Sequence, residues 1–123
     1  TTFGGGPLAC RLGFEFIKIL QEEKMVEDIK TKGIFFKQKL LELKKKHSCI
    51  VDVRGEGLML AAELNFPGRE IVDQGLEAGF VINVTANTVI RFLPPYIISK
   101  KEINQLVKTL DKLLSQSTKD HSE

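Results

Sequence analysis

The sequence has few of the residues that mark a disulfide-stabilised, zinc-binding or membrane-spanning protein. Two cysteines among 123 residues, Cys10 and Cys49, do not make a disulfide framework, and no paired cysteine and histidine spacing suggests a metal site. We expect both thiols to be small core residues in a reducing compartment. No apolar run approaches the roughly 20 residues that cross a bilayer, so no membrane partner is expected.

The sequence also has little excess charge of either sign. Its 18 Lys and Arg residues are nearly balanced by 16 Asp and Glu residues, and the two signs are mixed along the chain. This argues against a nucleic-acid partner. The one dense basic cluster, Lys44–Lys46, is expected to end a helix rather than to bind phosphate. With 42% hydrophobic residues, the composition is that of a soluble globular domain.

The N-terminal third of the chain has helical periodicity. Apolar residues recur every three or four positions after Pro7, and the pattern is interrupted at Gln21–Lys24. We therefore expect two helices, or one long bent helix, over residues 7–46. Gly33 lies on the apolar face, where it would allow close helix packing or mark a bend. Residues 1–48 thus form a glycine-rich loop and a helical segment.

Residues 49–114 are predicted to form a small C-terminal α/β domain. Val51 and Val53 are expected to share the buried face of its first strand. Ser99 and Glu102 have capping-box spacing before the last helix. The predicted strands cover 49–54, 58–64, 80–84 and 89–92, with a turn at 55–57, and the helices at 67–78 and 100–114 would cover the sheet. This order predicts an α+β fold with a small antiparallel sheet, followed by a disordered tail at 115–123.

Two segments are candidates for a binding site. Residues 1–7 form a glycine-rich loop that enters a helix. Its N–H groups and hydroxyls would suit a phosphate, although a flexible loop explains the same pattern. Arg91 lies in an apolar strand before two prolines, and a guanidinium can grip a carboxylate with two hydrogen bonds. A solvated surface arginine is an equal alternative, because Ile90 and Phe92 would share the opposite face.

The remaining polar candidates have structural interpretations. Arg54 and Glu56 flank the glycine-rich turn, where they would form a local ion pair or an interface contact. His47 is expected at a helix end and His121 in the tail. Neither histidine has the nearby serine, cysteine or aspartate arrangement that would indicate a catalytic triad.

Several segments together resemble the class III aminotransferases. Each alone is moderately specific, but the resemblance covers almost the whole chain in the right order and spacing. The matching segments are TTFGGGPLAC at 1–10, VRGEGLML at 53–60, VIRFLPP at 89–95 and the helix start SKKEI at 99–103. The segment NVTA at 83–86 is most similar to the acetylornithine aminotransferases of that family.

The resemblance implies the C-terminal small domain of a fold-type I enzyme that uses pyridoxal 5′-phosphate (PLP), preceded by a long helical segment. The intact enzyme would be a cytoplasmic homodimer of arginine biosynthesis. It would move an amino group from N-acetylornithine, or a related ω-amino acid, to 2-oxoglutarate. Ornithine and 4-aminobutyrate aminotransferases are the nearest alternatives within the family. A noncatalytic α/β binding or interaction module is the alternative from another class.

The same resemblance assigns roles to two residues. Thr2 matches the threonine whose hydroxyl and amide hold the PLP phosphate of the neighbouring subunit, and Arg91 matches the arginine that binds the substrate α-carboxylate. Gly6 stands where the family usually has asparagine, which alters the loop. The Schiff-base lysine and the aspartate that pairs with the pyridine nitrogen lie upstream of residue 1 in this family. We therefore expect a fragment without a catalytic residue, inactive alone.

The resemblance also predicts how the N-terminal segment behaves in such a fragment. Residues 1–6 are expected to be mobile, because a loop with three glycines needs a partner or phosphate to fix it. We expect the apolar face of the first helix, with Leu8, Leu12 and Phe16, to belong against the missing cofactor domain or the other subunit.

Overall fold

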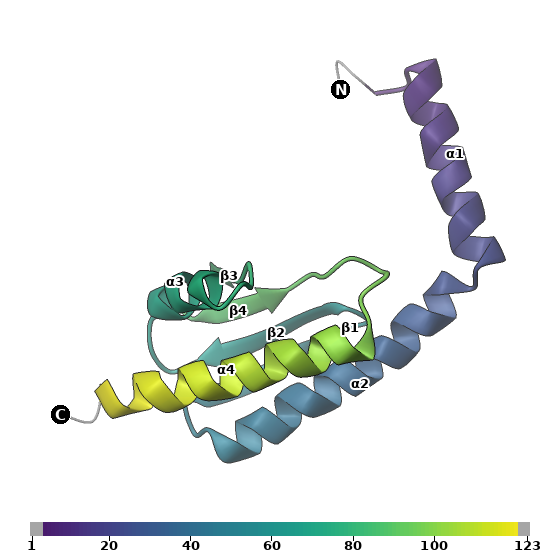
Figure 1. The fold of residues 1–123 in the computed structure, drawn as a ribbon. Helices are drawn as coiled ribbons and strands as arrows, with labels where there is room; N and C mark the ends of the chain where they lie inside the picture. Colours follow the sequence, from purple (N-terminus) through teal and green to yellow (C-terminus); the bar gives the residue numbers. More distant parts are fainter. Residues whose placement is uncertain (1–3, 121–123) are drawn as a thin grey trace.

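The structure is a computed structural model that describes residues 4–120. The order of helices and strands agrees with the sequence prediction, and the N-terminal segment forms two helices rather than one (Figure 1). The elements are α1 (Pro7–Glu22), α2 (Met25–Lys46), β1 (Ile50–Glu56), β2 (Met59–Leu64), α3 (Arg69–Glu77), β3 (Asn83–Thr85), β4 (Val89–Phe92) and α4 (Lys100–Asp120).

The four strands form one antiparallel sheet in the order β1-β2-β4-β3, which confirms the predicted α+β class. Helices α2 and α4 lie side by side across one face of the sheet, and α3 packs near β3 at one end (Figure 1). We expected residues 67–78 and 100–114 to cover this face. Both helices take part as expected, since α3 contributes the fully buried Ile71 to the core and packs against α4, and the structure adds α2 to the covering.

The core lies between the sheet and the two long helices. Helix α2 contributes Phe36, Leu40 and Leu43 to this core, and each of these residues is at most 6% exposed. The ring of Phe36 meets that of Phe92 edge-on, with centroids 5.1 Å apart. Helix α2 therefore packs with the segment 49–114, although the predicted boundary at residue 48 separates them. Helical periodicity located its apolar face but not the partner of that face.

The hairpin between β1 and β2 packs tightly against α2. Strand β1 continues to Glu56, so the turn consists of Gly57 and Leu58 rather than residues 55–57. Gly57 has φ +54°, a conformation that suits glycine at the first position of a two-residue hairpin turn. A Cβ on Gly33 would lie 2.3 Å from the Gly57 carbonyl oxygen. Gly33 therefore permits close packing rather than marking a bend.

Strand β1 contains an irregularity that overturns one detail of the prediction. The pairing with β2 shifts register between Ile50 and Asp52. A bulge of this kind moves the following side chains to the other face. Ile50 and Val53 are therefore both buried, while Val51 is 47% exposed. The expectation that Val51 and Val53 share the buried face is wrong for this reason.

The last helix is longer than the sequence pattern predicted. It begins at the expected capping box, where the Ser99 amide donates to Glu102 Oε2 at 2.7 Å and the Glu102 amide donates to Ser99 Oγ at 3.2 Å. The helix continues to Asp120 instead of ending at residue 114. The hydroxyls of Ser115 and Ser117 donate to carbonyl oxygens four residues earlier, so these polar side chains remain compatible with a helix. The prediction of a disordered tail is therefore wrong for residues 115–120, and residues 121–123 lie outside the described part of the chain.

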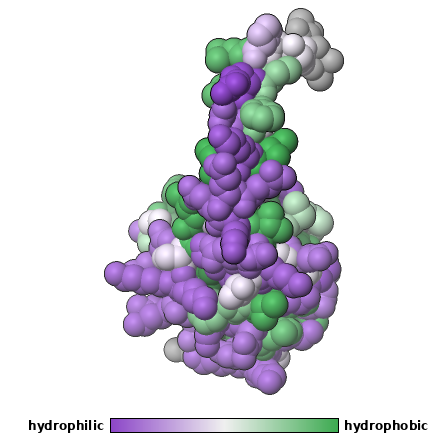
Figure 2. All heavy atoms as spheres, turned by 90° about the vertical axis from the view of Figure 1, so that its right-hand side faces the viewer, coloured by the Kyte–Doolittle hydropathy of each residue, from purple (hydrophilic) through white to green (hydrophobic). Residues whose placement is uncertain are grey.

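Helix α1 projects away from this compact part (Figure 1). It has no buried residue, and Cys10 is exposed, contrary to the expectation of a core thiol. Apolar surface is visible along the projecting helix in Figure 2. The exposed apolar residues of α1 are Leu8, Leu12, Phe14, Phe16, Ile17 and Ile19. Lys24, with φ +51°, joins α1 to α2.

Candidate functional site

The face of the sheet opposite α2 and α4, called here the outer face, carries the polar strand residues. Its first row crosses all four strands, because Arg54 pairs with Ala61, Ala61 with Arg91, and Arg91 with Asn83. Side chains directly opposite one another on an antiparallel sheet point to the same side. Arg91 therefore lies between a small side chain on β2 and a polar amide on β3.

A second row lies beside the first. Asp52 pairs with Glu63, Glu63 with Val89, and Val89 with Thr85. The two acidic residues of this row are thus on β1 and β2, away from β3. The outer face combines two cations in one row with two anions in the next.

Arg91 is exposed, and its neighbours Ile90 and Phe92 are buried on the other face, as strand alternation predicted. Among the described residues, no hydrogen bond or ion pair engages the Arg91 side chain. A guanidinium has five N–H donors in a fixed fork that matches a carboxylate. Arg91 is therefore available to an anionic ligand.

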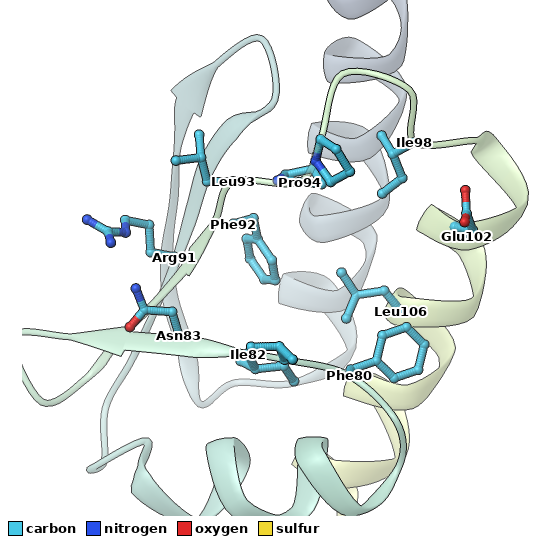
Figure 3. A pocket seen from close by; sticks show the side chains of 12 residues that line it. Phe80, Ile82, Asn83, Arg91, Phe92, Leu93, Pro94, Ile98, Glu102 and Leu106 are labelled. Atoms are coloured by element: carbon cyan, nitrogen blue, oxygen red, sulfur yellow. The ribbon is translucent and has the colours of Figure 1, made fainter.

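A cavity of about 530 Å³ adjoins Arg91. Phe80, Ile82 and Leu106 line its apolar side, towards α4 (Figure 3). Arg91 and Asn83 point away from these apolar side chains and form a polar edge (Figure 3). An apolar hollow with a few polar groups at its edge is the usual form of a small-molecule site. The arrangement suits an acid whose carboxylate lies at Arg91.

The other arginine of the row is fully engaged. Arg54 Nη1 donates to Asp52 Oδ2 at 2.8 Å and to Glu63 Oε2 at 2.5 Å. The hydrogen bond from Arg54 lowers the pKa of the Asp52 carboxyl, and the two carboxylates raise the pKa of Arg54. The expected ion pair of Arg54 is therefore local, but its partners are Asp52 and Glu63 rather than Glu56. Sequence reasoning missed Glu63 because its proximity depends on the register of β1 and β2.

The glycine-rich loop is described only in part. Thr2 lies outside the described residues, as do Thr1 and Phe3. Gly5 has φ +82°, and Gly6 is the N-cap of α1 without a side-chain cap. A Cβ on either glycine would meet nothing within 4 Å. Pro7 has no N–H and the Cys10 amide donates to the Gly6 carbonyl, so the amides of Leu8 and Ala9 are the first-turn donors of α1 that suit a phosphate group.

Comparison with known protein families identifies the family that has these features. The family model of class III aminotransferases matches residues 1–114, which include the loop, both arginines and the cavity. The chain belongs to the class III aminotransferase family. The resemblance seen in the sequence motifs is thereby confirmed.

Known relatives in this family are considerably longer than the chain. It is 44% identical over 97% of its length to acetylornithine aminotransferase of Methanocaldococcus jannaschii, and it covers 30% of that protein. It is 42% identical to the acetylornithine aminotransferase of Aquifex aeolicus, over 93% of the chain and 28% of the relative. The chain thus spans about 30% of the length of the relatives that it matches.

Solved class III aminotransferases share the fold. Acetylornithine aminotransferase from Elizabethkingia anophelis is 29% identical, with a TM-score of 0.85 over 94% of the chain and 30% of that structure. Ornithine aminotransferase from Toxoplasma gondii is 28% identical, with a TM-score of 0.86 over 98% of the chain and 30% of that structure. These matches extend over nearly the whole chain, so they include the N-terminal helices as well as the sheet.

The remaining candidates in this aminotransferase chain have structural roles. His47 caps the end of α2, as expected, and is buried. Its Nε2 lies 2.6 Å from Asp111 Oδ1, and Lys46 Nζ lies 2.6 Å from Asp111 Oδ2. Hydrogen bonds from Lys46 and then His47 lower the pKa of Asp111. Cys49 is buried as predicted, and burial raises the pKa of its thiol. His121 lies outside the described residues.

Within the described residues 4–120, no helix is both long enough and apolar enough to span a bilayer. No group of three or more histidine, cysteine, aspartate or glutamate side chains is placed to hold a metal ion within the same range.

Proposed function

We propose that the chain is the C-terminal part of a PLP-dependent aminotransferase that moves an amino group from N-acetylornithine, or a related ω-amino acid, to 2-oxoglutarate. The observation that carries the proposal is Arg91, an exposed guanidinium without a partner among the described residues, at the edge of a cavity in a class III aminotransferase chain. Amino-acid and oxo-acid substrates both bring an α-carboxylate that such a group binds.

The names of the relatives support the choice of amino donor. The relatives at 44% and 42% identity are acetylornithine aminotransferases, whereas ornithine aminotransferases are among the similar solved structures. N-acetylornithine is therefore our first choice and ornithine the second. Arginine biosynthesis, a cytoplasmic location and a homodimeric assembly follow from the first choice and belong to the same proposal.

The cofactor part of the proposal rests on the N-terminal loop. A structure of the Toxoplasma gondii ornithine aminotransferase contains PLP at partial occupancy in its active site. In the present chain, the open amides at the start of α1 suit the phosphate, and we assign Thr2 to the same group. PLP, when bound, supplies the electron sink of the reaction. We propose that Thr2 serves the phosphate bound mainly by the neighbouring subunit.

The carboxylate role of Arg91 is tested in the complete enzyme. Arg91→Ala is expected to lower kcat/KM for the amino donor and for 2-oxoglutarate alike, by about 30- to 5,000-fold, which corresponds to a loss of roughly 2–5 kcal/mol of transition-state stabilisation. Arg91→Lys should recover only part of this loss, because lysine lacks the planar fork. Arg69, which pairs with Asp73 on α3, offers the matched control Arg69→Ala. Unchanged kcat/KM for both substrates in Arg91→Ala would refute the assignment.

The cofactor role of Thr2 is tested separately. Thr2→Ala should weaken PLP retention more than it weakens substrate binding, as measured by cofactor dissociation. Mixed dimers that carry the substitution in one subunit would show whose cofactor is affected. Unchanged PLP affinity, or an effect confined to the altered subunit, would contradict the cross-subunit role. The chain alone should show no turnover with added PLP, because the proposal places the cofactor-bearing lysine outside it.

A further inference from the structure

We propose that Arg54 is a positioning residue that keeps Arg91 free for substrate by holding the carboxylate of Glu63. This inference rests on the proposed role of Arg91 in binding an α-carboxylate. It adds to that role a second arginine, which does not touch the substrate.

Glu63 lies between the two arginines on the outer face. Its neighbour Ala61 pairs with Arg54 on one side and with Arg91 on the other. Glu63, two residues farther along β2, is therefore a diagonal neighbour of both arginines. Diagonal pairs on one face of an antiparallel sheet are about 7–8 Å apart, within reach of long side chains. The register thus places Glu63 within reach of both arginines.

The contacts show which partner Glu63 takes. Its Oε2 accepts a hydrogen bond from Arg54 Nη1 at 2.5 Å, and the same nitrogen donates to Asp52 at 2.8 Å. Arg91 forms no hydrogen bond or ion pair with any of the described residues. Arg54 therefore hydrogen-bonds both acidic residues of the second row, while Arg91 has no partner among the described residues.

Glu63 is the carboxylate that is placed to compete with the substrate carboxylate for Arg91. Among the described strand residues, it is the one acidic residue on β2, β3 or β4 that lies next to Arg91 on the outer face. Asp52 and Glu56 lie on β1, which is separated from β4 by β2. Glu102, which lines the same cavity, accepts hydrogen bonds from the amide and hydroxyl of Ser99.

Loss of Arg54 would release Glu63 towards Arg91. An intramolecular carboxylate at Arg91 competes with the carboxylate of the substrate for the same guanidinium. The apparent affinity for substrate is then the intrinsic affinity multiplied by the fraction of Arg91 that remains unpaired. The expected rise in KM is roughly three- to sixfold, the competition that one exposed ion pair supplies.

The test uses the complete enzyme with Arg54→Gln, Glu63→Gln and the double variant. Arg54→Gln should raise KM for the amino donor and for 2-oxoglutarate, with little change in kcat, because saturating substrate displaces Glu63. The double variant should return both KM values to those of Glu63→Gln, since no carboxylate remains to compete. A merely structural role of Arg54 would not be rescued by changing Glu63. Arg54→Lys, which can still pair with Glu63, should keep KM low.

Controls separate this inference from the proposed function. Arg69→Gln removes a different surface ion pair and should leave both KM values unchanged. If Arg91→Ala lowers kcat/KM but Arg54→Gln does not raise KM, or if the double variant keeps the high KM, the role of Arg54 is overturned and that of Arg91 stands. If Arg91→Ala has no effect, the proposed carboxylate site itself fails.

Discussion

Helices α1 and α2 are consecutive in the chain and both amphipathic, yet they use their apolar residues in opposite ways. Phe36 of α2 is fully buried against the sheet, whereas Phe14 of α1 is 62% exposed. Among the described helices and strands, α1 contacts α2 and no other element. Helical periodicity therefore reveals that an apolar face exists, while the partner of that face follows from the rest of the fold.

The sharpest contrast is expected from removing one aromatic ring in each region. Phe36→Ala should destabilise the chain by about 3–5 kcal/mol, because it leaves a cavity in the core. Phe14→Ala should change the free energy of unfolding by less than about 0.5 kcal/mol, since the ring is largely in solvent already. Urea denaturation followed by circular dichroism measures both. Equal losses would show that α1 is packed in solution.

A pair of glycines gives the next largest contrast. Gly33→Ala places a Cβ against the backbone of Gly57, which cannot move aside cheaply, and should cost about 1–3 kcal/mol. Gly13→Ala in α1 meets nothing within 4 Å and should favour the helix by about 0.5–1 kcal/mol. Denaturation midpoints and helical circular dichroism report the two effects. Stabilisation by Gly33→Ala would contradict the close approach of helix and hairpin.

Helix caps provide a smaller contrast. Ser99→Ala removes the hydroxyl half of the capping box of α4 and should cost about 1 kcal/mol. Gly6→Asn gives α1 the side-chain cap that it lacks, and should favour that helix by only a few tenths of a kcal/mol. Amide hydrogen exchange at the two helix starts measures the change at each. A larger change in hydrogen exchange at the start of α1 in Gly6→Asn than at the start of α4 in Ser99→Ala would contradict this prediction.

The smallest predicted effect is the pH dependence of stability that arises from Asp111, whose carboxylate links α4 to the end of α2. Hydrogen bonds from Lys46 and His47 hold the pKa of Asp111 below its unfolded value of 3.8. The stabilisation is therefore complete above pH 3.8 and is lost as the pH falls through the lower pKa of the folded state. It should amount to less than about 1 kcal/mol, as solvent screens the pair.

Acid titration of stability provides the check on that last effect. Asp111→Asn should flatten the dependence of unfolding free energy on pH in this acid range. Glu15→Gln, which removes an exposed ion pair within α1, serves as the control and should not affect the unfolding of the compact part. A slope that is unchanged in Asp111→Asn would show that the bond between the two helices is not maintained in solution.

Local patterns predicted much of this fold. The capping box at Ser99 is a property of a few neighbouring residues and was found as expected. The bulge after Ile50 was not predicted, because it depends on pairing with β2. The same limit applies to the covering of the sheet by α2, since periodicity does not specify which surface a helix meets.

The candidate site shows the same division between local and long-range information. The motif resemblance identified Arg91, and strand alternation predicted that its side chain lies opposite Ile90 and Phe92. The partners of Arg54 were missed, because Glu63 comes near it through the register of a hairpin rather than through sequence spacing. Ala61, the small residue between the two arginines, carries no sequence signal of its own.

Because α1 is joined to α2 at Lys24, a small rotation at this residue produces a large displacement at the N-terminal end of α1. A helix of 16 residues is about 24 Å long at 1.5 Å per residue, so a rotation of about 10° at its base moves the far end by about 4 Å. Lys24 holds a left-handed backbone conformation, with φ +51° and ψ +34°, at this fulcrum. A small torsional change at Lys24 would thus displace Gly4–Gly6 much farther than the residues at the base of α1.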